Sequence, residues 1–200
     1  TMNKIGIQGG KGSFCEEAAQ EFVNNHGIEN VEMQYLITSD KVLAELENGN
    51  TDYGIFAMEN AQGGVVIESV EALATHRCEI VEMFYIPISQ NLLTRRGVFI
   101  GDITEIHSHQ QALRQCRDYL AEHFWTRPLI EADDTAESAR RLKEGKLPPT
   151  TAVIGSKSCA DIYGLVVLQE NIHDLKNNLT LFMGVKQFSK GSGQEKTEDE

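Results

Sequence analysis

Apolar and polar positions alternate along the chain in a way that predicts short strands and amphipathic helices in turn. In the first half, apolar runs next to glycine or polar residues predict strands, and spacings of three and four predict helices. The expected strands cover residues 5–7, 31–37 and 53–58 and a long extended stretch 78–93, and the expected helices cover 14–25, 39–48 and about 66–74. The second half repeats the pattern, with strands at 103–106, 129–132, 151–155, 165–168 and 178–188 and helices at 108–124, 135–144 and 156–163. This order indicates an α/β chain in two halves, with parallel strands under helices and a cleft between the halves.

Charge and composition narrow the classes of partner. The chain has 200 residues and a net charge of −12, and residues 1–90 hold fourteen acidic and only four basic residues. A basic surface for nucleic acid is therefore not expected. No apolar run approaches the roughly 18 residues that cross a bilayer, and the first residues lack the apolar segment of a signal peptide. We expect a cytoplasmic protein without a nucleic-acid or membrane partner.

The cysteines, histidines and arginines carry three further expectations. The four cysteines, Cys15, Cys78, Cys116 and Cys159, are scattered and are expected to be reduced thiols. His107 and His109 could suggest a metal site, but no pattern of Cys or carboxylate residues completes a set of ligands. No metal is therefore expected. Seven of the eight arginines follow residue 90, so the cationic partners of an anionic ligand are expected in the second half.

A glycine-rich turn follows the first expected strand. It runs from Gly9 through Gly12 and Ser13 to Phe14, and Ser13 has the position of a helix N-cap with Glu16 three residues later. Its backbone N–H groups and the helix dipole could hold an anion, although a plain tight turn is an equally good interpretation.

A second polar segment, residues 58–64, follows the strand at 53–58. Asn60 stands just past a buried strand, where its amide can face the cleft, and Gly63 and Gly64 allow close approach of the backbone. The alternative is that Asn60 caps its own turn.

Residues 107–116 form the third segment. Ser108 has the position of a helix cap, and Ser108, Gln111 and Gln115 fall on one helical face. Such a stripe could hydrogen-bond a carboxylate or a hydroxyl, or it could simply face solvent.

The fourth segment is residues 178–182. In an extended strand Asn178, Thr180 and Phe182 face one way, and Leu179 and Leu181 face the other.

These segments, in this order, resemble the prephenate dehydratase family. The family opening G-P-x-G-[ST]-F-[SC]-x-x-A-A corresponds to residues 9–19, its E-N-S-x-x-G segment to 59–64 and its H-S-H-P-Q-A-L-x-Q-C segment to 107–116. A T-A-x-x-A segment matches 135–139, and Y-G-L-x-V-L-x-x-N-I-x-D matches 163–174. The likeness covers about residues 3–186. It implies a two-lobed fold like that of type II periplasmic binding proteins, with lobe 1 formed by residues 1–92 and 175–188 and lobe 2 by 93–174. Residues 189–200 are rich in Gly, Ser, Lys and Glu, and this composition predicts a disordered tail.

The resemblance implies conversion of prephenate to phenylpyruvate, with loss of water and carbon dioxide, in phenylalanine biosynthesis. It places Thr180 near the leaving hydroxyl and makes Asn60, Ser108 and Gln115 orienting donors. The implied substrate-binding residues are Gly12, Ser13, Phe14, Glu59, Gly63, Gln111 and Phe182. It implies no cofactor, because aromatisation drives the reaction, and we expect a homodimer or a higher homo-oligomer.

Three positions depart from the family motifs. Leu181 replaces the arginine of N-x-T-R-F, Ala61 replaces the serine of E-N-S, and Gln110 replaces a proline. The ACT domain that follows in many relatives is not expected in the short acidic segment after residue 188. We expect activity to be retained, because alternation turns position 181 away from Thr180.

Two alternatives stay open: a catalytically weak domain that binds a small carboxylate as a sensor, and a decarboxylase that keeps the hydroxyl. The choice between prephenate and its amino counterpart arogenate also stays open.

Overall fold

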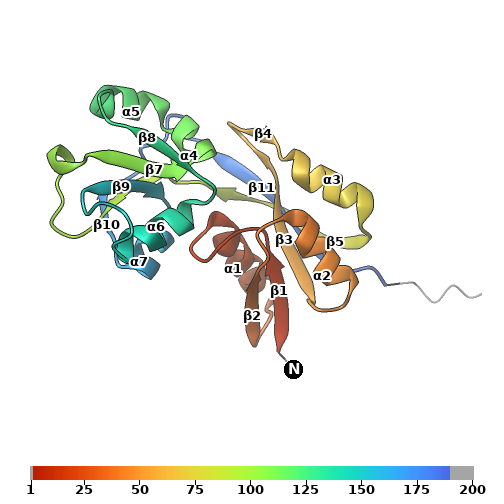
Figure 1. The fold of residues 1–200 in the computed structure, drawn as a ribbon. Helices are drawn as coiled ribbons and strands as arrows, with labels where there is room; N and C mark the ends of the chain where they lie inside the picture. Colours follow the sequence, from red (N-terminus) through yellow and green to blue (C-terminus); the bar gives the residue numbers. More distant parts are fainter. Residues whose placement is uncertain (1, 190–200) are drawn as a thin grey trace, which may run out of the picture.

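The computed structural model describes residues 2–189, which form two β-sheets with helices packed against both (Figure 1). The tail predicted from residue 189 onward lies outside the described residues except for Ser189. In the part of the chain that is described, every helix is too short or too polar to cross a membrane.

The first sheet has the strand order β2-β1-β3-β11-β5, with β4 added to β3. Its strands are β1 (Asn3–Ile7), β2 (Val31–Tyr35), β3 (Tyr53–Asn60), β4 (Gly64–Val65), β5 (Cys78–Pro87) and β11 (Leu179–Gln187), and its helices are α1 (Phe14–His26), α2 (Ser39–Glu47) and α3 (Ile67–Thr75). Strand β1 runs parallel to β2 and β3, whereas β11 is antiparallel to β3 and β5. Phe22 of α1 packs on one face of the sheet, and Leu43 of α2 and Ala72 of α3 pack on the other.

The second sheet has the order β10-β6-β9-β7-β8. Its strands are β6 (Asn91–Thr94), β7 (Glu105–His109), β8 (Leu129–Ala132), β9 (Thr151–Gly155) and β10 (Val166–Gln169), and its helices are η1 (Ile100–Asp102), α4 (Gln110–Gln115), α5 (Arg117–Phe124), α6 (Thr135–Lys143) and α7 (Lys157–Tyr163). Leu120 of α5 belongs to the core on one face, and Leu142 of α6 to the core on the other. The predicted α/β fold in two halves is therefore confirmed.

Two crossover segments join the sheets. The chain leaves the first sheet after Pro87 and enters the second at Asn91, and it returns between Gln169 and Leu179. Leu92 already pairs with Ile154 of the second sheet, so the change of sheet comes just before the boundary expected after residue 92. The division into 1–92 with 175–188 and 93–174 stays our proposal for the lobes.

Local sequence explains several element boundaries directly. Ser13 is the N-cap of α1 as predicted, and its Oγ accepts a hydrogen bond from the Glu16 N–H at 3.4 Å. The side chain of Glu16 does not return to Ser13, because its Oε2 instead accepts from the Gly12 N–H at 2.6 Å. Strand β9 has the predicted bounds, and α7 follows with Ser156 as its N-cap.

Other boundaries differ because tertiary contacts override local spacing. The extended stretch expected at 78–93 is two strands in different sheets, broken at residues 88–90. The helix expected at 108–124 is two helices that are divided at Cys116. Ser108 is not its N-cap: β7 continues to His109, which takes that place, because the buried Ser108 Oγ donates to the Ile154 carbonyl of β9. The sheet expected to be parallel is mixed, because β11 is inserted between β3 and β5.

Candidate functional site

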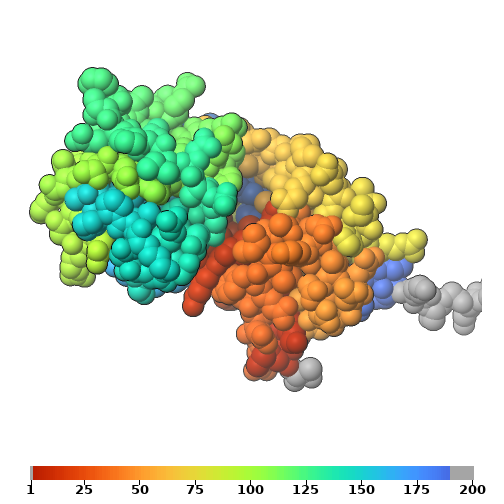
Figure 2. Space-filling view, in the orientation of Figure 1, coloured from red at the N-terminus to blue at the C-terminus, as the bar shows by residue number. Residues whose placement is uncertain are grey.

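A cavity of about 490 Å³ lies between the two sheets, and both halves of the chain contribute to its walls (Figure 2). The first half supplies the loop after β1 and the segment from Asn60 through β4, and β11 supplies Thr180 and Phe182. The second half supplies residues from both ends of α4, from the N-terminal end of α6 and from the N-cap of α7.

Nine of the eleven predicted site residues line this cavity. They are Gly12, Ser13, Phe14, Asn60, Gly63, Gln111, Gln115, Thr180 and Phe182. Leu181 does not line it, although both of its neighbours in β11 do. The alternation expected for this strand is therefore observed at the cavity wall.

Asn60 is the centre of a hydrogen-bond network, and its amide has a defined direction. Its Oδ1 accepts from the backbone N–H groups of Gln62 at 3.0 Å and Gly63 at 2.9 Å. Since backbone N–H groups only donate, Oδ1 must face them, and Nδ2 must face the other way. The turn-capping role and the cleft-facing role, which the sequence left as alternatives, are thus filled by the two ends of one amide.

The Nδ2 group of Asn60 reaches two partners that flank Leu179 in the chain. It donates to Thr180 Oγ1 at 2.8 Å and to Asn178 Oδ1 at 3.0 Å. The Leu179 carbonyl is farther away, at 3.4 Å. The Thr180 hydroxyl is the acceptor in this contact, so its own hydrogen stays available for a group in the cavity.

Gln115 extends the network from the second half. Its Nε2 donates to Asn60 Oδ1 at 3.1 Å, and its Oε1 accepts from Gln90 Nε2 at 2.9 Å. Gln90 lies in the first crossover segment, and its backbone N–H donates to Nδ1 of the buried His173 in the second at 3.2 Å. Burial lowers the pKa of His173, which favours the neutral ring that can accept this bond.

Ser108 and Glu59, the other two predicted residues, lie outside the cavity wall. Ser108 is fully buried behind Thr135, with 2.9 Å between the two hydroxyl oxygens, and Thr135 is the residue that lines the cavity. Glu59 is exposed on β3, opposite Leu181 of β11 and Val65 of β4. Strand alternation explains why Glu59 points away from the cavity, because its neighbour Asn60 faces the cavity.

The charged residues of the cavity wall differ from the expectation that arginines of the second half would bind an anionic ligand. Among the described residues the lining contains neither Lys nor Arg, and Asp134 is its one carboxylate. The prediction that Lys or Arg side chains from the second half line the ligand site is therefore wrong for this cavity. Asp134 caps α6, with Oδ1 accepting from the Ala136 N–H at 3.1 Å. Burial, reinforced by Asp134, raises the pKa of Cys15 to about 12, which keeps this cavity thiol protonated.

Several cavity residues carried no assignment from the sequence: Gln8, Gln90, His109, Asp134, Thr135 and Ser156. The sequence could have indicated Thr135 and its neighbour Asp134 as site residues, because Thr135 begins the T-A-x-x-A segment. Gln8 and Gln90 sit in no motif, and only the packing of the two halves brings them to the cavity.

Two glycines bring the halves into contact at the cavity rim. A Cβ atom on Gly63 would lie 2.0 Å from Gln111 Nε2, so the turn after Asn60 meets α4 closely. Ser156 Oγ donates to the Gly12 carbonyl at 2.9 Å, which ties the glycine-rich turn to the start of α7. This turn has a structural role in joining the halves, in addition to any role toward an anion.

Metal-binding side chains do not cluster in residues 2–189, where no group of three or more His, Cys, Asp or Glu side chains could hold an ion. His107 is engaged with Glu105, with 2.9 Å between His107 Nε2 and Glu105 Oε1.

The comparisons with known proteins agree on one family. A sequence model described as Prephenate dehydratase matches residues 5–190. The prephenate dehydratase of Lactococcus lactis is 34% identical over 184 residues, which are 90% of this chain and 62% of that protein. Arogenate dehydratase 2 of Petunia hybrida is 32% identical over 180 residues, 90% of this chain and 44% of that protein.

A solved structure supports the same fold. The prephenate dehydratase of Arthrobacter aurescens, in complex with L-Phe, is 28% identical and has a TM-score of 0.84. The match covers 93% of this chain and 60% of that one. The chain thus spans 44% to 62% of the length of these relatives.

Proposed function

The chain belongs to the prephenate dehydratase family, and from that premise we propose that its cavity converts prephenate to phenylpyruvate, water and carbon dioxide. This is the chemistry of a carbon–oxygen lyase in phenylalanine biosynthesis. In the reaction the ring C–O bond to the hydroxyl and the ring C–C bond to the carboxylate both break. The electron pair of the broken C–C bond enters the ring, and the departing hydroxide takes up one proton to become water.

The hydrogen bond from Asn60 to Thr180 is the observation that carries the proposal. Because Asn60 Nδ2 donates to Thr180 Oγ1 at 2.8 Å, the threonine hydrogen is free for the leaving hydroxyl. A hydrogen bond received by Thr180 also polarises its O–H group and makes it a better donor. Thr180 is 7% exposed, so this donor acts in a site that excludes most water.

Asn60 and Gln115 support Thr180 from the two halves of the chain. The two backbone N–H groups at Gln62 and Gly63 fix the Asn60 amide, and Gln115 donates to the same oxygen. We assign Asn60 and Gln115 as orienting residues. Ser108 acts one step farther from the substrate in this proposal, by positioning Thr135.

Neutral donors take the place of cations in anchoring the carboxylates. Gln8 Oε1 accepts from the Ala57 N–H at 2.9 Å, so its Nε2 hydrogens remain for a ligand. The N–H groups of Phe14 and Cys15 in the first turn of α1 have no intrahelical acceptor. We propose that these groups hold the carboxylate of the pyruvyl arm. The carboxylate that leaves as carbon dioxide then lies against the apolar wall, where loss of its charge is favoured.

A direct assay tests the proposal. The protein is incubated at neutral pH with prephenate and, separately, with arogenate, and phenylpyruvate and phenylalanine are quantified. We expect turnover of at least one substrate by the wild type and its loss in Thr180→Val. Tight binding without turnover of either would support a small-carboxylate sensor instead. Loss of carbon dioxide with retention of the hydroxyl would support the decarboxylase.

Assembly and location complete the proposal. We propose a homodimer or a higher homo-oligomer, which light scattering on the purified chain tests. All four cysteines of the chain are free thiols, which fits a reducing compartment, and we place the reaction in the cytoplasm.

A further inference from the structure

Four side-chain amides stand in a line that passes through the candidate site. Gln90 donates to Gln115, Gln115 donates to Asn60, and Asn60 donates to Asn178. The three donor–acceptor distances are 2.9, 3.1 and 3.0 Å. Asn60 comes from β3 and Gln115 from α4, whereas the two outer amides belong to the two crossover segments.

The direction of every amide in this line follows from one anchor. The backbone N–H groups of Gln62 and Gly63 fix Oδ1 of Asn60 as an acceptor. Gln115 must then present Nε2 to that oxygen and Oε1 to Gln90, and Asn178 must present Oδ1 to Asn60. No amide in the line can be turned over without placing two donors or two acceptors against each other.

The two ends of the line are complementary, and neither has a partner in the part of the chain that the structure describes. Gln90 Oε1 is an acceptor and Asn178 Nδ2 is a donor, and both atoms are buried without a hydrogen bond among the described residues. The two side chains are only 5% and 2% exposed. A buried polar atom without a hydrogen-bond partner destabilises the protein. Here one unpartnered acceptor and one unpartnered donor lie in the same network, so both contribute this penalty.

The segments that carry these ends are joined by backbone hydrogen bonds. The Ile88 N–H donates to the Asn178 carbonyl at 2.7 Å, and the Ile172 N–H donates to the Gln90 carbonyl at 2.9 Å. Both crossovers must bend when the two halves move relative to each other, so the gap between the ends responds to that motion.

We propose that Gln90 and Asn178 are positioning residues whose free amide groups join when substrate fills the cavity, completing a ring of four amides. The fourth bond runs from Asn178 Nδ2 to Gln90 Oε1. Its formation relieves both unpartnered groups in the bound state and not in the free protein, and it holds Asn60 and Gln115 toward Thr180. Because the gain appears only in the complex, it adds to ligand affinity and to the orientation of Thr180 in the complex, and it adds nothing to the stability of the free protein. The inference rests on the proposed function for its rate effect, but the ring itself can be tested by binding alone.

A double-mutant cycle tests the ring. Gln90→Met and Asn178→Leu remove the amides with little change in volume, and the double variant completes the cycle. We expect each single substitution to lower kcat/KM about tenfold, through weaker binding as well as a lower kcat, and the double variant to be little worse than either. Affinity for phenylpyruvate, the product, should show the same non-additivity. Unfolding of the ligand-free protein by urea should show additive effects.

Thr94→Val is the matched control. Thr94 is buried in β6, its Oγ1 also lacks a hydrogen-bond partner within residues 2–189, and it does not line the cavity. Combined with Gln90→Met, it should be additive in binding, rate and stability.

Two outcomes would overturn the inference. Equal non-additivity in ligand-free unfolding would mean that the ring is already closed, for example through a buried water, and additivity in both states would mean that it never closes. If the wild type turns over neither substrate, the proposed function fails. The double-mutant cycle on phenylpyruvate affinity then still shows whether the ring closes.

A measurement on the wild type covers the case in which a variant does not fold. The side-chain amide of Asn178, assigned in ¹⁵N spectra by comparison with Asn178→Asp, should shift and exchange its hydrogens about tenfold more slowly when phenylpyruvate is added. An unchanged resonance in protein saturated with phenylpyruvate would contradict ring closure.

Discussion

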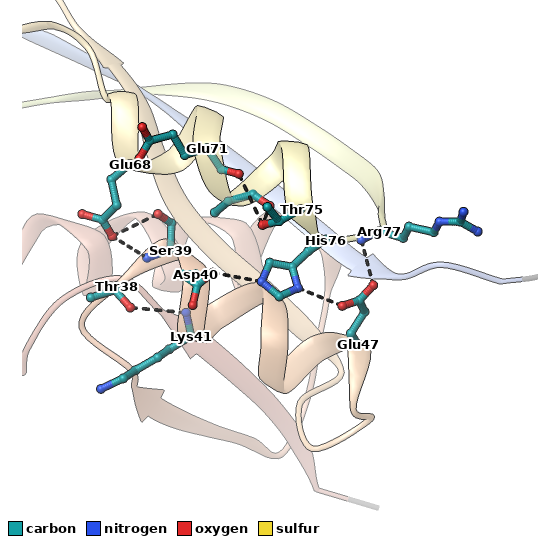
Figure 3. Close-up of polar contacts among 11 residues, drawn as sticks. Thr38, Ser39, Asp40, Lys41, Glu47, Glu68, Glu71, Thr75, His76 and Arg77 are labelled. Atoms are coloured by element: carbon teal, nitrogen blue, oxygen red, sulfur yellow. Dashed lines mark hydrogen bonds and ion pairs between the residues drawn. The ribbon is translucent and has the colours of Figure 1, made fainter.

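Two side-chain networks join separate elements of this protein, and they use opposite chemistry. The network around Asn60 is made of neutral amides and hydroxyls and connects both halves at the cavity. The other network lies between α2 and α3, where His76 bridges Asp40 and Glu47 (Figure 3). The nitrogen–oxygen distances are 2.8 Å from Nδ1 to Glu47 and 3.0 Å from Nε2 to Asp40.

The charged network also reaches the backbone at the ends of both helices. Glu47 accepts from the Arg77 N–H at 2.9 Å, and Glu68 of α3 accepts from the N–H and hydroxyl of Ser39 at the start of α2. The hydrogen bond to Glu47 raises the pKa of His76, and the same bond lowers the pKa of Glu47. This network therefore changes with pH.

The contrast separates two tasks. Amides hold one direction at every physiological pH and can place a donor beside a reacting bond. The imidazole and its carboxylates fix helix ends near solvent, where the strength of the contact depends on protonation. This contrast agrees with the proposed function, in which the neutral network orients Thr180, and it leaves the charged network a role in stability.

The largest expected effect comes from Thr180→Val. The substitution keeps the shape of the side chain and removes the hydroxyl hydrogen that the neutral network directs into the cavity. A positioned proton donor contributes roughly 10²–10⁴-fold to a rate, so kcat should fall by that order while KM changes little. Steady-state kinetics with prephenate measure this, and the urea midpoint should stay close to that of the wild type. A fall of less than about threefold would remove Thr180 from the mechanism.

His76→Gln should affect stability and leave the rate unchanged. The substitution removes the cation that contacts both carboxylates, so the denaturation temperature at pH 6 should fall by a few degrees. His76 has a raised pKa in the folded state, so its stabilisation is fully present below its ordinary pKa of 6.5 and is lost as pH rises through the raised value. The difference from wild type should therefore shrink by pH 9. His123→Gln, at a more exposed histidine of α5, is the control, and a changed kcat in His76→Gln would break the contrast between the networks.

His173 should give the opposite dependence on pH. Burial lowers its pKa in the folded state, so the unfolded chain takes up a proton first as pH falls below 6.5. Stability should then decrease toward acid. His173→Asn keeps an acceptor for the Gln90 N–H and removes the titration, so urea midpoints between pH 5 and pH 6.5 should slope less than those of the wild type. An unchanged slope would mean that another group dominates in this range.

The smallest effect is expected from Leu181→Arg, which restores the family motif. Leu181 does not line the cavity and lies opposite the exposed Glu59, so a guanidinium there can pair across the strands at little cost. We expect kcat/KM to stay within about threefold of the wild type, since a gain of 1.4 kcal/mol in transition-state binding would be needed for tenfold. A tenfold gain would show that the arginine reaches the substrate, and the sensor alternative would then be favoured.

The sequence by itself determined the elements that depend on neighbours in the chain. Ser13 caps α1 because its hydroxyl reaches a backbone N–H three residues away. Strand β9 is buried at every residue, and its apolar sequence shows this without knowledge of its partners. The alternation in β11 placed Thr180 and Phe182 on one face and Leu181 on the other, because the period of a strand is fixed by the backbone.

Only the tertiary structure decided which polar groups meet. Ser108 fits a helix cap by spacing, yet its hydroxyl finds the Ile154 carbonyl 46 positions away and is buried in a strand. Residues 78–93 form a continuous extended pattern, but they divide between two sheets because β11, from the far end of the chain, pairs with β5. Gln90 carries no local signal, and it becomes part of the site only because Gln115 and His173 pack beside it. Hydrogen-bond direction in a buried network depends on every partner at once, and those partners are distant in sequence, so no local pattern can specify it.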